Sequence, residues 1–126
     1  MLFQGRSLRK ATGGRYTNTN PKKLHGKASR PTLTDIGQER RREKRTRGGN
    51  SKKFLLSTSQ VNLFDPKKKK HVKAKLEVVK KSSANRNFTR RNILTKGTLI
   101  KTDKGMAKVT NRPGQEGIVN AILQEE

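Results

Sequence analysis

The segment from Gly37 to Lys53 constrains the fold more than any other, because none of its 17 residues is apolar. Eight of these residues are Lys or Arg, and two are Glu. A segment of this kind has no face to bury, so hydrophobic burial cannot hold it in shape. The sequence therefore predicts that this segment lies outside any core and that an acidic partner orders it.

The centre of this segment, Arg45 to Asn50, combines arginines with two adjacent glycines. Planar guanidinium groups match phosphate oxygens two at a time. Glycine allows a positive φ and lets a phosphate come close to the backbone. The pattern favours a phosphate-binding element over the alternative, a solvated charged linker. A second basic segment, residues 9–15, contains another Gly-Gly pair.

The whole chain has a formal charge of +23, from 32 Lys and Arg against 9 Asp and Glu in 126 residues. Self-repulsion at this charge favours a polyanionic partner, and nucleic acid fits best. Cysteine is absent, and two histidines cannot build a zinc centre by themselves. The few acidic residues form no general acid–base pair. We therefore expect no enzyme, no cofactor, no metal site and no small-molecule substrate.

The apolar runs of the chain are short. None approaches the roughly 18–20 residues that span a bilayer, and the start of the chain lacks the apolar region of a signal peptide. No basic helix with a wide apolar stripe is apparent, which argues against a membrane-active cationic protein. We expect a cytoplasmic protein without a membrane partner.

Apolar residues divide the chain into two unequal parts. Counting Val, Ile, Leu, Met, Phe and Tyr and leaving Met1 aside, residues 1–53 hold seven and residues 54–126 hold 21. Only the second part can form a small core. We predict a basic N-terminal extension over residues 1–53 and a compact domain over residues 54–126. Leu33 and Ile36 are the candidate anchors of the extension.

The second part has the patterns of short β-strands. From Val72 to Val78 every second residue is apolar, which predicts a half-buried strand. Residues 103–105 predict a hairpin turn with glycine where a positive φ is needed. Residues 118–123 close the domain as a strand or a short helix. Five or six short strands with tight turns predict an all-β fold, a small antiparallel β-barrel-like domain behind an extended basic tail.

Aromatic residues make up only 4% of the chain. A platform that stacks single-stranded bases needs several of them, and the paired aromatics of an RNA-recognition domain are missing. Recognition of folded RNA by shape and backbone is therefore favoured. Tyr16 stacks on a base or fills a gap, with neither preferred. For the Lys67–Lys70 loop, a solvated tip is slightly favoured over an RNA-facing loop.

Several motifs occur in an order that resembles a known family. They are Arg9-Lys10-Ala11-Thr12-Gly13-Gly14-Arg15, Arg45-Thr46-Arg47-Gly48-Gly49-Asn50, Ala84-Asn85-Arg86, Arg90-Arg91-Asn92-Ile93, Thr95-Lys96-Gly97 and Asn111-Arg112-Pro113-Gly114-Gln115-Glu116-Gly117. Each motif alone is weakly specific. The ordered set is similar to the archaeal form of small-subunit ribosomal protein eight, in its "eight-e" family.

The resemblance implies a structural constituent of the small ribosomal subunit that binds 16S-type rRNA beside neighbouring ribosomal proteins. It also implies a β-barrel-like domain whose N-terminal extension enters the rRNA. The alternative is a general nucleic-acid-binding basic protein, such as a chromatin-like DNA compactor. The candidate RNA-binding residues are Arg6, Arg9, Lys10, Gly13, Gly14, Arg15, Lys22, Lys23, Lys27, Arg30, Arg40, Arg41, Arg42, Lys44, Arg45, Arg47, Gly48, Gly49, Asn50, Lys52, Arg86, Arg90, Arg91, Lys96 and Arg112.

Overall fold

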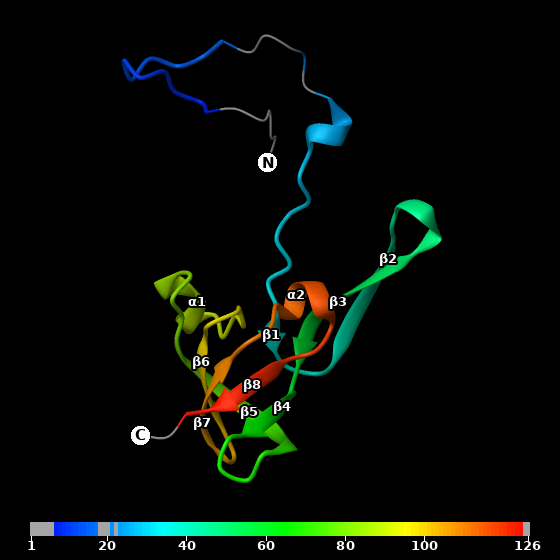
Figure 1. Ribbon diagram of the computed structural model, residues 1–126, viewed down its shortest axis with the longest axis vertical. Helices are drawn as coiled ribbons and strands as arrows, with labels where there is room; N and C mark the ends of the chain where they lie inside the picture. The colour runs from blue at the N-terminus through cyan, green and yellow to red at the C-terminus, as the bar shows by residue number, and fades with distance from the viewer. Residues whose placement is uncertain (1–6, 18–20, 22, 125–126) are drawn as a thin grey trace. The chain divides into compact units, whose positions relative to one another are not determined.

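The computed structural model describes residues 7–17, 21 and 23–124 (Figure 1). The chain forms two compact units, residues 1–31 and residues 32–126. The first contains a short 3-10 helix, η1 (Leu24–Gly26), and the second contains the named strands and α-helices. The predicted division into an rRNA-binding extension over residues 1–53 and a compact domain over residues 54–126 concerns function, and it stays a prediction.

Five strands of the second unit close into a barrel in the order β4-β5-β6-β7-β8. Consecutive neighbours pair antiparallel, whereas β4 and β8 pair in parallel and complete the closure. The predicted small barrel is confirmed, and its pairing is mixed where the sequence suggested antiparallel strands throughout. The strands are β4 (Gln60–Asp65), β5 (Lys70–Lys81), β6 (Leu99–Thr102), β7 (Gly105–Val109) and β8 (Asn120–Leu123).

A three-stranded sheet in the order β1-β3-β2 stands next to the barrel. Strand β2 (Arg40–Arg45) and strand β3 (Ser51–Thr58) form an antiparallel hairpin, and the two-residue β1 (Asp35–Ile36) pairs with β3 in parallel. The outer end of the hairpin projects away from the barrel, with η2 (Arg47–Gly49) at its tip (Figure 1). Because only Ser59 separates β3 from β4, the hairpin is continuous with the barrel wall.

The core fills the barrel with side chains from alternate strand positions, as expected for half-buried strands. Ile100 and Ala107 have no exposed surface, and Val61 and Leu63 lie two residues apart on β4. The buried cluster consists of Leu55, Val61, Leu63, Ala74, Leu76, Val79, Leu94, Ile100, Ala107, Val109, Val119 and Ala121.

The predicted alternation on β5 holds only for part of the strand. Val72 and Val78 are 37% and 38% exposed, so both lie outside the core. A register shift between Leu76 and Val78 adds a residue to β5, and such a bulge turns the next side chain to the other face. Val79 therefore takes the inward position. Val72 is exposed because β6 pairs with β5 only from Leu76 onward.

Thr34 joins the segment before β1 to the rest of the unit. It is fully buried, its Oγ1 donates to the carbonyl oxygen of Leu55 at 2.7 Å, and its carbonyl accepts from the amide of Leu94 at 2.7 Å. Ile36 packs against the core as predicted. Leu33 is 36% exposed and is not an anchor, because the buried position belongs to the hydrogen-bonded Thr34.

Two short helices lie between the strands, where the sequence predicted only an all-β fold. Helix α1 (Arg86–Arg90) begins after Asn85, whose side chain accepts from the amide of Asn87 at 2.9 Å. Helix α2 (Pro113–Glu116) lies within the motif from Asn111 to Gly117. The turn at Gly105 is confirmed by its φ of 126°. The open choice for residues 118–123 is resolved as strand β8.

Candidate nucleic-acid interface

One face of the β2–β3 hairpin carries Arg42, Lys44 and Lys52. Arg42 lies opposite Phe54, and Lys44 lies opposite Lys52; directly opposed residues share a face of the ladder. All three cations are exposed. Like charges that face each other across a ladder destabilise it. An anion bound between Lys44 and Lys52 would relieve this repulsion.

The opposite face carries Arg41, Arg45 and Lys53, together with one carboxylate. Glu43 lies opposite Lys53, and Arg41 forms an ion pair with Glu39 at 2.5 Å. This face is therefore partly neutralised, and the face of Lys44 is not. Lys53 was missed as a candidate from the sequence. A hairpin that turns at Gly48-Gly49 sets Ser51 opposite Arg45 and therefore Lys53 opposite Glu43. This strand register would have indicated Lys53 as a candidate.

The tip of the hairpin is a tight turn from Thr46 to Asn50. The amide and hydroxyl of Thr46 both donate to the carbonyl of Asn50, at 2.6 and 2.9 Å. Gly48 and Gly49 have φ of 82° and 85°, a region that residues with a Cβ rarely adopt. A Cβ at either glycine would find its nearest neighbour at 3.9 Å. The chain leaves this space open, so an outside group can approach the backbone.

A second Gly-Gly turn lies in the first unit, between bridged residues Arg9 and Arg15. The amide of Lys10 donates to the carbonyl of Gly14 at 2.8 Å, and an Arg9 guanidinium nitrogen donates to the carbonyl of Gly13 at 2.9 Å. Gly13 has a φ of 84°. Both predicted Gly-Gly elements are therefore tight turns with a left-handed glycine and exposed cations.

Tyr16 and the tetralysine segment were left open by the sequence. Tyr16 is 42% exposed, and the Lys10 ammonium lies 5.7 Å from its ring centroid. The residues Lys67–Lys70 surround a turn in which the Asp65 carboxylate accepts from the amides of Lys67 and Lys68, at 3.0 and 3.3 Å. This carboxylate–amide pattern explains the turn that the Asp-Pro pair predicts.

A protein-family model now decides the identity: the ribosomal protein S8e family matches residues 3–124. The chain belongs to the ribosomal protein S8e family. Curated relatives agree, each being a small ribosomal subunit protein eS8 from an archaeon. The protein of Methanospirillum hungatei is 44% identical over 99% of this chain and all of its own length. That of Methanoculleus marisnigri is 45% identical over 98% of both chains, and that of Picrophilus torridus is 42% identical over 97% of this chain and 98% of its own.

Further motifs that resemble the S8e family lie elsewhere in the second unit. Arg86, Arg90 and Arg91 line α1 and its end, and Lys96 precedes a glycine at a φ of 83°. Arg112 stands at the start of α2. Each of these cations is exposed. Figure 1 shows α1 and the hairpin tip at separate places in the unit, so the fold does not gather all candidates into one patch.

The remaining candidates that the structure describes are exposed cations. Arg40 donates from Nε to the hydroxyl of Ser57 at 3.1 Å, which ties it to the base of the hairpin. Lys23, Lys27 and Arg30 are exposed around or after η1. Arg6 and Lys22 lie outside the described residues.

Within residues 7–17, 21 and 23–124, no three metal-binding side chains cluster closely enough to hold an ion. No helix in those ranges has the length and apolar character needed to cross a membrane.

Proposed function

We propose that the chain holds folded rRNA of the small subunit through its two Gly-Gly turns and the exposed cations that flank them. The observation that carries the proposal is the tip of the β2–β3 hairpin. There, two glycines at positive φ leave open space beside the backbone, between the exposed Arg45, Arg47 and Asn50.

Membership of the S8e family indicates where this interface would be used. As an S8e protein, the chain is a structural component of the small ribosomal subunit, and the family is not enzymatic. Such a protein works in the ribosome, among rRNA and other ribosomal proteins. Which residues contact the rRNA is the part that we propose.

The physics of the tip suits a phosphate-rich partner. Guanidinium groups donate two parallel hydrogen bonds to a phosphate, and each neutralised phosphate releases counterions. Ordering the backbone costs roughly 1–2 kcal/mol per residue. The ladder of β2 and β3 already orders the base of the tip, so less of this entropy remains to be offset on binding.

Competition binding tests the proposal against a general DNA compactor. Labelled small-subunit rRNA fragment is bound to the full chain, then challenged with unlabelled fragment or with duplex DNA of equal length. We expect the rRNA fragment to compete at least about tenfold better, because the folded RNA offers converging phosphates that a regular duplex lacks. Equal competition would favour the DNA compactor.

A second measurement, co-sedimentation, tests the proposal in the assembled small subunit. The chain should co-sediment with small subunits and stay bound after a high-salt wash. A variant with Arg45→Ala and Arg47→Ala should wash off at lower salt, because fewer phosphate contacts remain. A variant that washes off at the same salt as the parent would exclude the tip from the rRNA interface.

A further inference from the structure

The outer wall of the barrel carries a row of four outward-facing side chains that belong to different strands. His71 lies opposite Phe64, Phe64 lies beside Ile122, and Ile122 lies opposite Lys108. The inward neighbours on these strands, such as Leu63 and Ala121, are buried, so the row faces out. Two apolar side chains therefore stand between a histidine and a lysine.

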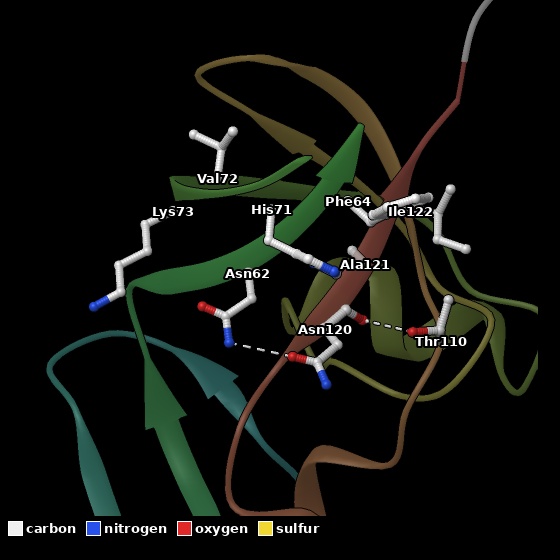
Figure 2. Close-up of a pocket in the computed structure, with 9 residues that line it drawn as sticks. All are labelled: Asn62, Phe64, His71, Val72, Lys73, Thr110, Asn120, Ala121 and Ile122. Atoms are coloured by element: carbon white, nitrogen blue, oxygen red, sulfur yellow. Dashed lines mark hydrogen bonds between the residues drawn. The ribbon is translucent and has the colours of Figure 1, made fainter. Parts of the chain in front are cut away.

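A second, polar row runs next to the first. Lys73 lies opposite Asn62, which pairs in turn with Asn120. The Asn62 amide nitrogen donates to the Asn120 side-chain oxygen at 3.2 Å (Figure 2). Within the described residues, the Asn62 side-chain oxygen accepts no hydrogen bond from the chain and the Asn120 side-chain nitrogen donates none to it. Together they present one acceptor and one donor, the complement of a peptide group.

All residues of the two rows except Lys108 line a cavity of about 640 Å³ (Figure 2). Ile122, which lines this cavity, is 41% exposed. A smaller hollow of about 190 Å³ shares Asn62 and Lys73 and extends to the exposed Ile118. Apolar side chains are thus exposed at both the cavity and the hollow, so the wall can contact more than one side chain of a partner.

The charges of this wall differ from those of the hairpin. All 13 arginines of the chain lie outside β4–β8, and the cations of these strands are lysines. Lys73 and Lys108 stand at opposite sides of the apolar pair. We propose that this wall binds an extended segment of a neighbouring protein, with an apolar side chain on Phe64 and Ile122 and carboxylates beside Lys73 and Lys108.

A nucleobase would use the same cavity less well. The ring of Phe64 already packs against His71, with centroids 4.9 Å apart and planes tilted by 44°, so His71 takes part of the ring surface on which a base would stack. Ile122 and Ile118 are aliphatic and offer no flat surface. A peptide instead satisfies the apolar pair, the two free amide atoms and the flanking lysines together.

Photo-crosslinking in reconstituted small subunits tests the occupant. The full chain carries a benzophenone side chain in place of Ile122, and a control carries it in place of Val78, which is 38% exposed on the outer side of β5. We expect position 122 to crosslink to one peptide with an apolar residue near a carboxylate, and position 78 not to crosslink to it. An adduct of position 122 with RNA would overturn the proposal.

Binding of a synthetic copy of the crosslinked peptide then tests the chemistry. We expect Ile122→Asp to weaken binding at least about tenfold, as for a buried contact at the centre of an interface, and Val78→Asp to leave it unchanged. Both variants should bind the rRNA fragment like the parent, so a failure here is distinct from a failure of the proposed rRNA interface. Equal peptide affinity for the two variants would refute the docking site.

Discussion

The outer half of the β2–β3 hairpin and the β4–β8 barrel are built on opposite principles. Every residue of β2 is exposed, and its order comes from backbone pairing with β3. In the barrel, inward side chains such as Ile100 and Ala107 have no exposed surface. The barrel is thus stabilised by burial, whereas the hairpin gains little from it. Its side chains remain available to a partner.

The cations of the two regions differ in kind. The hairpin carries five arginines beside three lysines, whereas the barrel strands carry lysines and no arginine. A guanidinium binds phosphate with a rigid fork, whereas an ammonium acts as a strongly hydrated point charge. We therefore base the proposed rRNA interface on the chemistry of the cations and on the glycines beside them, and not on net charge alone.

Amide exchange on the free protein should give the largest contrast. Barrel amides such as that of Ile100 exchange only on global opening, which for a stable domain slows exchange about 1,000-fold or more. We expect the amides of residues 42–50 to exchange much faster than those of the barrel, because their ladder can open locally without exposing the core. Protection of residues 42–50 equal to that of the barrel would break the comparison.

Core truncation should separate the two regions by stability. Leu63→Ala removes a side chain that is 2% exposed and should lower the free energy of unfolding by about 3 kcal/mol. Arg45→Ala should change it by less than about 0.5 kcal/mol, since that side chain is exposed. Urea denaturation measures both, and a loss of similar size in Arg45→Ala would show that the hairpin is part of the stable core.

Replacing cations in the hairpin tip should lower the affinity for rRNA more than replacing cations in the Lys67–Lys70 turn. The triple variant Arg45→Ala, Arg47→Ala, Asn50→Ala should bind an rRNA fragment about 100-fold more weakly, as expected for two lost charge-assisted contacts. Replacing all of Lys67–Lys70 by alanine should weaken it less than about tenfold, although it removes more charge. A larger loss from the lysine set would place the interface on the barrel turn.

Gly48→Ala and Gly49→Ala sharpen the comparison at constant charge. Both glycines have positive φ, so we expect about fivefold weaker binding at every salt concentration, from roughly 1 kcal/mol of backbone strain. The slope of log affinity against log salt should not change. Arg47→Ala should reduce that slope by about 0.7–0.9, the share of one phosphate. If the glycine variants bind like the parent, the tip acts as a flexible polycation and the backbone geometry of Gly48 and Gly49 does not contribute to binding.

The smallest effect is expected in the N-terminal turn, where two adjacent glycines differ. Gly13 has a positive φ of 84°, whereas a Cβ on Gly14 would make only an ordinary contact with Thr12 at 3.7 Å. Gly13→Ala should weaken rRNA binding about threefold through backbone strain, and Gly14→Ala should match the parent. The reverse order, in the same binding assay, would show that the turn changes shape on binding.

The sequence alone indicated which part of the chain has a core, where its cations lie and which turn glycines could adopt a positive φ. These properties follow from local composition and from the backbone freedom of glycine at Gly48, Gly49 and Gly105, so they need no knowledge of distant partners. The buried cluster indeed lies almost wholly after residue 54, from Leu55 to Ala121. The family resemblance came from ordered motifs in the same way, and the comparisons confirm it.

Only the tertiary structure decided which residues meet. The parallel pairing of β4 with β8 joins strands that are more than 50 residues apart, and no local pattern encodes it. The bulge after Leu76 moves Val78 outward against its own alternation. The outward row from His71 to Lys108 depends on three strand registers at once. Registers are set by the packing of the whole core, and a shift of one residue would turn these side chains inward.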